Sequence, residues 1–320
     1  MVRLKTSAGF FLGALVGICQ TVAWRGPISG IVHDAPSHSL RQVVGVPGGA
    51  YLGAPLRANV ESAAISPDGN AAVATEDGRA ILIEELRNDS PLVRELADVG
   101  EISAAAWGVN SGVAVIYSAS SRRVWRITIG TEAPDALVAE PGLPEGEVAS
   151  VATDADGTRV LVSLRHPENG GIYEMVDGSA VRVVQTPAPG AIVFSSVRSE
   201  FLALDNGERR VLKLSSSEPG AWEQIDLASD EDQAGELKGL AVSKDGRNLY
   251  VAADGRVLIY DLGGRFLSSQ IDLPAAPDRV AELAAADAVY VLTSRQKSEE
   301  PLWILDARRV PSVFFVPAGE

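Results

Sequence analysis

The sequence predicts an all-β fold built from repeated units, and three observations lead to this prediction. The segment Ile65–Gly69 (ISPDG) is matched by Val242–Gly246 (VSKDG), 177 residues further along the chain. A second turn, Asp77-Gly78, is matched by Asp254-Gly255 at the same offset. A quarter of this offset is about 44 residues, and turns recur near that spacing at Asp68, Asn110, Asp156, Arg198, Asp245 and Asp287. Four antiparallel strands in each such unit, repeated around a ring, are the pattern of a β-propeller.

Each unit offers short strands whose composition fits a place in a propeller blade. The strand before the first turn is rich in small residues, as in Ser62–Ile65, which suits the crowded axis of the ring. More apolar strands follow, such as Val113–Ile116 and, after the second turn, Val257–Tyr260, and a weaker fourth strand such as Val181–Val184 closes most units. The Asp-Gly pairs need only a structural explanation, because glycine supplies the positive φ of a tight hairpin.

The ends of the repeat decide the number of blades. Ser29–Asp34 and Leu40–Gly45 precede the first full unit and resemble the third and fourth strands of a unit. Six full units and this half-unit predict seven blades with an incomplete first blade; a six-bladed ring with an extra hairpin is the alternative. We expect Ser312–Val316 to supply the last strand, and the propeller domain to cover residues 24–320.

One stretch carries a resemblance to a known group of repeats. Asn248–Val251, followed by Asp254-Gly255 and Val257–Asp261, resembles the YVTN/WD40-like repeat of secreted β-propeller proteins. The resemblance covers roughly residues 28–317, and the Trp-Asp and Gly-His signatures of true WD40 repeats are missing. By analogy it permits a propeller lactonase, an enzyme that would need carboxylates, amides or histidines around a divalent metal at the channel mouth.

The first 25 residues have the features of a secretory signal. Two positive residues precede an uncharged run, Thr6–Trp24, and small residues stand at the positions that signal peptidase requires. We expect cleavage after Ala23, so that residues 1–23 form the signal peptide. An uncut anchor is the alternative, because the run is about long enough to span a bilayer. Ile18 stands before Cys19, where a lipoprotein signal needs a small residue, so a lipid anchor is rejected.

Charge and cysteine content narrow the function classes further. The chain has 42 acidic and 28 basic side chains and a formal charge of −14, which becomes −16 after the predicted cleavage. An acidic chain lacks the basic surface that nucleic-acid binding requires. Its single cysteine lies in the predicted signal, so the mature domain would be free of cysteine and suited to an oxidising compartment. We therefore expect a secreted or periplasmic protein.

The residues that usually carry catalysis are scarce. The chain has three histidines, no Gly-x-Ser-x-Gly elbow and no phosphate-binding loop of the Gly-x-x-x-x-Gly-Lys kind. Thr153–Gly157 could offer oxygen ligands to calcium, but it aligns with ordinary hairpin turns of the other units. The acidic segment Asp230–Asp232 with Glu236 is interpreted as a solvated loop. We expect no cofactor and no catalytic residues, and leave metal binding open.

The long connections indicate a candidate binding surface. Loops between second and third strands, and loops between blades, emerge on the same face of a propeller; here they include Ser118–Arg123, Arg165–Gly171, Ser294–Pro301, Pro47–Asn59, Pro141–Glu147 and Ala228–Glu236. Long loops with polar tips are typical of a binding surface, although loops also lengthen where selection is relaxed. The side chains expected to contact a ligand there are Arg122, Arg123, Arg165, His166, Arg295 and Lys297.

These observations together predict a secreted or periplasmic, non-catalytic propeller that acts as a binding module or scaffold. Its partner would be a protein, peptide or glycan on the long-loop face. We expect a monomer that binds no nucleic acid and has no stable membrane insertion after signal cleavage. The alternative function is a lactonase-like, metal-dependent hydrolase.

Overall fold

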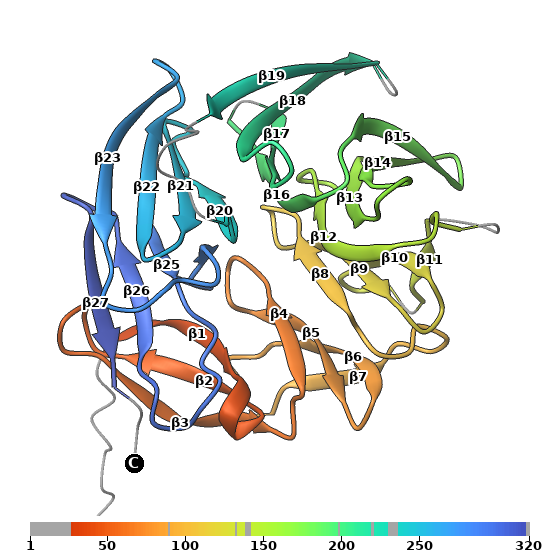
Figure 1. Cartoon of the computed structure of the whole chain (residues 1–320). Coiled ribbons are helices and arrows are strands. Elements are labelled where there is room, and N and C mark those ends of the chain that lie inside the picture. The colour runs from red at the N-terminus through yellow and green to blue at the C-terminus, as the bar shows by residue number, and fades with distance from the viewer. Residues whose placement is uncertain are drawn as a thin grey trace, which may run out of the picture.

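The chain folds into seven antiparallel sheets arranged as blades around a central channel (Figure 1). The computed structural model describes residues 27–88, 90–131, 133–137, 142–197, 199–218, 221–229 and 236–317. Six blades have four strands and the first blade has three. This confirms the prediction of a seven-bladed β-propeller with an incomplete first blade, and the six-bladed alternative is wrong.

Every blade consists of strands that follow one another in the sequence. Blades 1 to 3 contain β1 (Ile28–Asp34), β2 (Ser39–Val44) and β3 (Tyr51–Ala58); β4 (Ser62–Ile65), β5 (Ala71–Glu76), β6 (Arg79–Glu84) and β7 (Leu92–Glu95); and β8 (Ala104–Trp107), β9 (Val113–Ser118), β10 (Arg123–Thr128) and β11 (Asp135–Ala136). Blades 4 and 5 contain β12 (Glu147–Thr153), β13 (Val160–Arg165), β14 (Gly171–Val176) and β15 (Ser179–Gln185); and β16 (Pro189–Ser195), β17 (Glu200–Asp205), β18 (Arg210–Glu218) and β19 (Ala221–Ser229). Blades 6 and 7 contain β20 (Gly239–Val242), β21 (Asn248–Ala253), β22 (Arg256–Asp261) and β23 (Phe266–Asp272); and β24 (Ala281–Glu282), β25 (Val289–Val291), β26 (Leu302–Asp306) and β27 (Ser312–Val316).

Helical structure is minimal. The described residues contain one 3-10 turn, η1 (Ala35–Ser37), between β1 and β2. Across the same residues, no helix reaches the length and hydrophobicity needed to cross a membrane. The predicted signal peptide, residues 1–23, lies outside the described residues.

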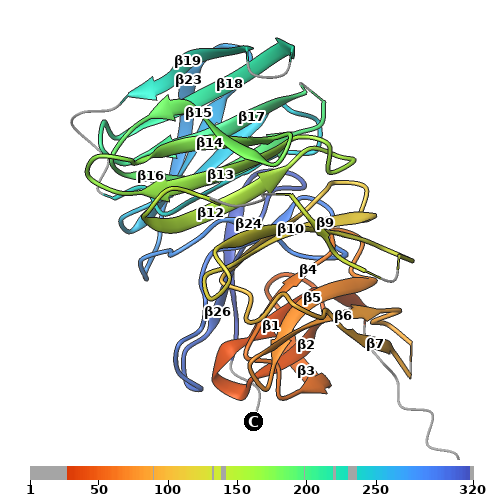
Figure 2. The same ribbon diagram turned by 90° about the vertical axis from the view of Figure 1, so that its right-hand side faces the viewer.

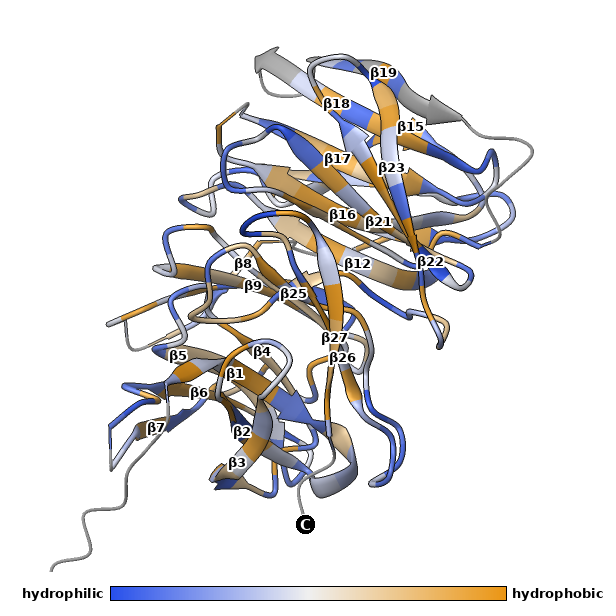
Figure 3. Cartoon of the chain, turned by 90° about the vertical axis from the view of Figure 1, so that its left-hand side faces the viewer, coloured by the Kyte–Doolittle hydropathy of each residue, from blue (hydrophilic) through white to orange (hydrophobic). Residues whose placement is uncertain are grey.

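The hydrophobic core lies between neighbouring blades. Val115 and Tyr117 of blade 3, for example, pack in one cluster with Val162 and Leu164 of blade 4. The second and third strands of a blade supply most of these side chains, and every residue of β9 is buried. Figure 3 shows hydrophobic residues concentrated along the strands and hydrophilic residues in the peripheral loops. Each blade therefore depends on its neighbours for stability.

The disc has two distinct faces, and Figure 2 shows the blades from the side. In blades 2 to 7 the first strand runs from one face to the other. We call the face where this strand ends the turn face; it carries the connections between first and second strands and between third and fourth strands. The opposite long-loop face carries the connections between second and third strands and those between blades.

The first blade departs from this pattern, and its sequence-based assignment is wrong. Ile31 of β1 forms an antiparallel bridge with Ala284, just after the first strand of blade 7, so β1 runs opposite to the innermost strands of the other blades. The strands β1, β2 and β3 therefore match the second, third and fourth strands of a unit, rather than the third and fourth. The segment Pro47–Asn59, expected as a loop, contains β3. Gly53 and Pro55 conceal this strand in the sequence, and proline is tolerated there because β3 lies at the edge of its sheet.

The ring closes at the seam between blades 1 and 7 without a strand shared by the two ends of the chain. The backbone N–H of Ile31 donates to the carbonyl oxygen of Ala284 at 3.1 Å. A buried hydrophobic cluster also crosses the seam, with Val43 and Leu52 on one side and Ile304 and Val316 on the other.

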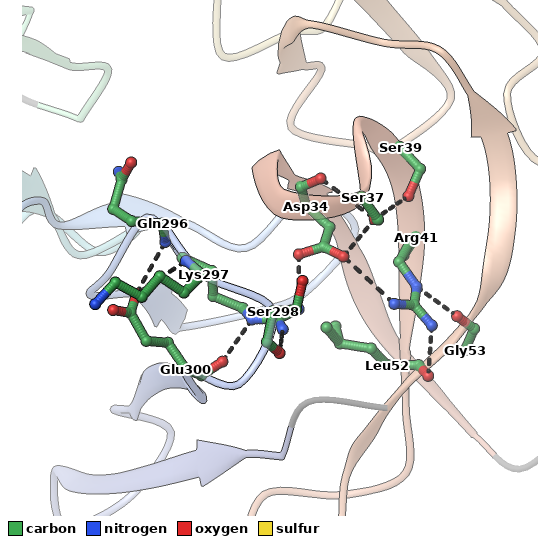
Figure 4. Close-up of polar contacts among 11 residues, drawn as sticks. Asp34, Ser37, Ser39, Arg41, Leu52, Gly53, Gln296, Lys297, Ser298 and Glu300 are labelled. Atoms are coloured by element: carbon green, nitrogen blue, oxygen red, sulfur yellow. Dashed lines mark hydrogen bonds and ion pairs between the residues drawn. The ribbon is translucent and has the colours of Figure 1, made fainter. Parts of the chain in front are cut away.

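A buried ion pair completes this closure (Figure 4). Arg295, in the loop after β25, places its Nη1 2.6 Å from Oδ1 of Asp34 at the end of β1. Both side chains are almost fully buried, with exposures of 5% and 2%. Arg41 approaches the other carboxylate oxygen of Asp34 at 3.3 Å, and Arg295 also donates to the backbone oxygens of Ser298 and Glu300. The loop between β25 and β26 of blade 7 is thus attached to the first blade.

Candidate functional site

A large hollow lies at the mouth of the central channel on the turn face. Its volume is about 730 Å³, which lies in the range of ordinary ligand sites. The first strands and first turns of blades 2 to 7 form its wall. Its lining includes Asp68, Trp107, Val109, Asn110, Phe194, Val197, Lys244, Glu282 and Tyr290.

Apolar side chains at turn tips surround this mouth. Val109 and Val197 lie in the first turns of blades 3 and 5, and they are 40% and 61% exposed. Trp107, the last residue of β8, also lines the hollow, and its indole N–H donates to the carbonyl oxygen of Ala64 at 2.9 Å. Tight turns usually carry polar residues, so valine at two such tips has no explanation in turn geometry. The mouth therefore presents apolar surface where the fold does not require it.

Exposed apolar side chains are concentrated on the turn face across the whole disc. The large hydrophobic side chains that are exposed in a turn or at a strand end on the turn face are Ile28, Val46, Tyr51, Leu92, Val109, Val197, Phe266 and Val310. The remaining exposed ones, Val93, Val181 and Phe315, lie within outer strands. Within the described parts of the long-loop face there are none. Concentration of exposed apolar side chains on one face is characteristic of an interaction surface.

A small ionic cluster stands at the blade 6 side of the hollow. The ammonium group of Lys244 lies 3.2 Å from a carboxylate oxygen of Glu282 and 3.2 Å from one of Asp287. Burial raises the pKa of Glu282, and the neighbouring Lys244 opposes this shift. For Lys244, burial favours the neutral amine, but the two carboxylates outweigh it and raise its pKa. The cluster therefore holds Lys244 in its charged form beside two carboxyl groups, one of which, Glu282, lines the hollow.

Asp68, on the opposite side of the mouth, caps its own turn. Its Oδ1 accepts hydrogen bonds from the hydroxyl of Ser66 at 2.6 Å and from the backbone N–H of Asn70 at 3.0 Å. Burial alone would raise the pKa of Asp68, but these hydrogen bonds to the carboxylate outweigh it and lower the pKa. The side chain is therefore ionised at neutral pH and serves the turn.

The six residues predicted to bind a ligand lie on the long-loop face, but on three separate blades. Arg122 and Arg123 belong to blade 3, and Arg165 and His166 to blade 4, its neighbour. Arg295 and Lys297 belong to blade 7, which blades 1 and 2 separate from blade 3. The structure thus places two of the three residue pairs on neighbouring blades, and the third pair, Arg295 and Lys297, elsewhere on the ring.

Several of these side chains are held by the protein itself. Arg122 donates to the carbonyl oxygen of Leu143 at 3.2 Å, and Arg165 donates to that of Pro189 at 3.1 Å. The Nδ1 atom of His166 accepts the backbone N–H of Asn169 at 3.0 Å. The two arginine contacts order connections between blades, and the histidine contact orders the loop between β13 and β14.

Arg295 and Lys297 share a loop but have different surroundings. Arg295 is buried against Asp34, so its guanidinium group closes the ring instead of facing solvent. Lys297 is exposed at the tip of the loop. A ligand-binding role for Arg122, Arg123, Arg165, His166, Arg295 and Lys297 stays a prediction.

A smaller hollow of about 370 Å³ runs along the channel beside blades 7, 1, 2 and 3. It shares Pro67, Trp107 and Glu282 with the larger hollow and extends to His33, Arg279 and Ser294. The Nε2 atom of His33 lies 2.9 Å from the carbonyl oxygen of Val60. Burial lowers the pKa of His33; the hydrogen bond with Val60 and the charge of Asp34 oppose this shift, and Arg279 and His38 reinforce it. His33 thus joins blade 1 to the connection that leads into blade 2, and burial favours its neutral form.

This lowered pKa predicts a loss of stability in acid. Because His33 takes up a proton less readily when folded, its contribution is complete above the ordinary pKa of 6.5 and is lost as the pH falls through the folded value. The free energy of unfolding of the wild type should fall more steeply between about pH 7 and about pH 5 than that of His33→Gln, by at most about 1.4 kcal/mol per pH unit. Urea denaturation at a series of pH values measures this, and parallel curves for the two proteins would contradict it.

Metal-ligating side chains do not gather in the described part of the chain, where no group of three or more His, Cys, Asp or Glu side chains could hold a metal ion. In the segment Thr153–Gly157, considered above for calcium, Asp154 accepts the backbone N–H of Thr158 at 2.8 Å and so acts as a turn cap. The acidic residues 230–232 lie outside the described residues.

The turn-face hollow is the feature that sequence reasoning missed. Its wall comes from turns about 42 to 47 residues apart, each of which is an ordinary hairpin when considered alone. The one local signal is the valine in two of these turns, Val109 and Val197, where the other units place Pro67, Ala155, Lys244 and Ala286.

Comparisons with known proteins support the fold and go no further. No family model matches the chain, and no curated protein matches it in sequence. Among solved structures, a functionally unknown protein from Desulfotomaculum acetoxidans is similar over 91% of this chain and 99% of its own, with 13% identity and a TM-score of 0.62. Kuenenia stuttgartiensis hydrazine synthase is similar over 95% of this chain and 100% of the matched chain, with 14% identity and a TM-score of 0.58. At these identities the likeness concerns the β-propeller fold alone.

Proposed function

We propose that this protein is a non-catalytic binding module that acts outside the cytoplasm and holds a protein, peptide or glycan partner at the turn-face hollow. The observation that carries the proposal is the hollow itself, a cavity of about 730 Å³ whose mouth presents exposed valines at two turn tips. The signal-like sequence of residues 1–23 and the absence of cysteine from residues 24–320 favour export.

The character of the hollow favours binding over catalysis. Asp68 is engaged in a turn cap, Glu282 pairs with Lys244, and the hydroxyl of Tyr290 donates to the carbonyl oxygen of Val242 at 3.5 Å. Its aromatic and aliphatic lining supplies the apolar contact that dominates recognition at a protein surface. A lactonase-like reaction would need a metal centre, for which the described residues offer no ligand cluster.

The long-loop face remains the second candidate surface. Its support is the neighbouring placement of Arg122 and Arg165, whose blades 3 and 4 adjoin each other. Both guanidinium groups are partly committed to backbone carbonyls, as described above, and the described part of this face exposes no large apolar side chain. We therefore place the partner on the turn face first.

A pair of matched variants distinguishes the two faces. The immobilised wild-type protein is used to capture partners from the extracytoplasmic fraction of its own source, alongside Val109→Asp/Val197→Asp and Arg122→Ala/Arg165→Ala. Because charged side chains at the mouth would have to be desolvated on binding, the valine variant should lose at least about tenfold in affinity, while the arginine variant keeps it. Loss in the arginine variant alone would move the site to the long-loop face, and equal capture by all three proteins would contradict the proposal.

A further inference from the structure

The smaller hollow of the channel has a structural origin in the incomplete first blade. Because β1 corresponds to the second strand of a unit, Ile31, Val32 and His33 line the channel directly. The inner strand of blade 7, β24, has two residues, so Val291 and Leu302 of the next two strands also reach the hollow. The resulting space of about 370 Å³ is within the size range of small-molecule sites.

Most of the wall of this hollow is small and apolar. Alanines from the first strands of blades 2, 3 and 7 line it, and Trp107 lies where it joins the turn-face hollow. Its charged lining residues are Arg279 and Glu282. Glu282 pairs with Lys244 at 3.2 Å, so Arg279 is the lining residue whose charge is available to a ligand.

The backbone of Arg279 is fixed on both sides. Its N–H donates to the carbonyl oxygen of Leu292 in blade 7 at 3.3 Å. On blade 6, a Cβ atom added to Gly239 would lie 2.8 Å from the Cα atom of Arg279, so the two segments are in close contact. The side chain of Arg279 therefore extends into the hollow from a rigid base.

The guanidinium group of Arg279 is paired more weakly than other sheltered arginines of the ring. It donates to the hydroxyl of Ser294, but its Nε atom lies 3.8 Å from Oδ1 of Asp278, which is beyond hydrogen-bond distance. Both carboxylate oxygens of Asp278 instead accept the backbone N–H of Ser294, at 2.8 and 2.9 Å. By contrast, Arg159, Arg210 and Arg295 each have a carboxylate oxygen within 3.2 Å, on Glu174, Asp205 and Asp34 respectively.

The electrostatic surroundings of Arg279 favour an added negative charge. Burial within the channel lowers the pKa of Arg279, and the charge of Asp278 opposes this shift. The side chain is nevertheless 49% exposed, and because it lines the hollow, a ligand there can reach it. A guanidinium group has five N–H donors in a planar fork that matches the two oxygens of a carboxylate.

We propose that the smaller hollow binds an organic monocarboxylate, with its carboxylate group held by Arg279 and its apolar body along the alanine wall toward Trp107. One cation on the wall matches a singly charged carboxylate, whereas phosphate groups carry more charge and are usually held by several donors. The apolar wall supplies the remaining contact. This ligand is additional to the partner proposed at the turn-face mouth.

Isothermal titration calorimetry with hexanoate tests the site. The wild-type protein should bind hexanoate saturably with a Kd below about 5 mM, and its neutral analogue hexanamide at least about tenfold more weakly. Arg279→Gln should weaken hexanoate binding at least about tenfold. The matched control is Arg247→Gln, an arginine 80% exposed in the first turn of blade 6, which should change the Kd less than about twofold.

Three results would overturn the proposal. One is equal affinity of the wild type for hexanoate and hexanamide, a comparison that needs no variant to fold. The others are unchanged binding by Arg279→Gln and the lack of saturable binding up to about 50 mM hexanoate.

Two further arms locate the ligand and identify its source. Val109→Asp/Val197→Asp, which alters the mouth, should bind hexanoate within about threefold of the wild type; a loss as large as that of Arg279→Gln would place the ligand at the mouth and overturn the proposal. N-acetyl-tetraalanine carries one carboxylate, at its C-terminus. If it binds more tightly than hexanoate and depends on Arg279, the ligand is a peptide terminus; if it binds more weakly, the ligand is a free organic acid, and both results support a carboxylate at Arg279.

Discussion

Arg295→Ala should lower the free energy of unfolding by about 3–5 kcal/mol, because it leaves the carboxylate of Asp34 buried beside the weaker partner Arg41. Asp34 is only 2% exposed and lies 2.6 Å from the guanidinium group that the substitution removes. The same substitution frees the backbone carbonyls of Ser298 and Glu300, which Arg295 now orders. Urea denaturation followed by tryptophan fluorescence measures the loss.

An exposed ion pair of similar chemistry provides the control. Arg308 contacts Asp306 through two nitrogens, but its side chain is 48% exposed, so Arg308→Ala should cost less than about 1 kcal/mol. Comparison of the two variants separates the effect of burial on stability from the effect of ion pairing alone. Equal losses for Arg295→Ala and Arg308→Ala would show that the seam ion pair has no special role in closing the ring.

Glu174→Ala should have a comparably large effect, about 3–5 kcal/mol, at the boundary of blades 4 and 5. Glu174 is buried in β14, where one carboxylate oxygen lies 3.2 Å from Nε of Arg159 and the other accepts the indole N–H of Trp222 at 2.7 Å. The guanidinium group of Arg159 stacks on the same indole ring, 4.1 Å from its centroid. Removal of the carboxylate leaves a partly buried cation and an indole N–H without this acceptor.

Two further variants give this prediction a scale. Glu174→Gln keeps the shape and an acceptor oxygen but removes the charge. Its free energy of unfolding should therefore lie between those of the wild type and the alanine variant. Glu95→Ala, which removes an exposed partner of Arg79, should cost less than about 1 kcal/mol. Thermal unfolding of the four proteins ranks them, and a Glu174→Ala protein as stable as Glu95→Ala would refute the argument.

Most of the ring could be predicted from the sequence because a propeller repeats a local pattern. The Asp-Gly turns at Gly78 and Gly255 both adopt positive φ, at 72° and 68°, and each joins the second and third strands of its blade as expected. Such turns depend on neighbouring residues alone, and therefore appear in the sequence.

The first blade shows where local patterns stop being informative. The sequence of β1 resembles a strand of the repeat, but the direction of a strand in the ring depends on which strands it meets. That information lies in the contact between Ile31 and Ala284, which are about 250 residues apart in sequence. Arg295 illustrates the same point, because in sequence it is a cation in a long polar loop, and its burial depends on Asp34, 261 residues earlier.

The candidate site was the least predictable part for a related reason. A hollow at the axis belongs to no single repeat, since each of six blades contributes a turn or strand end to its wall. Each turn is an ordinary hairpin when considered alone, and the longest loops, which predict a binding surface on the opposite face, are the more conspicuous feature of the sequence. Val109 and Val197 are the residues that could have redirected it.

The way the ring closes also has a mechanical consequence. Because each blade is made of consecutive strands, no sheet contains both the first and the last described strand, and the seam is held by side chains and by the hydrogen bond from Ile31 to Ala284. The chain leaves the disc at Pro27 on one face and at Pro317 on the other. A pulling force applied to the two ends therefore loads the seam before any sheet, and the circle opens there before the blades unravel.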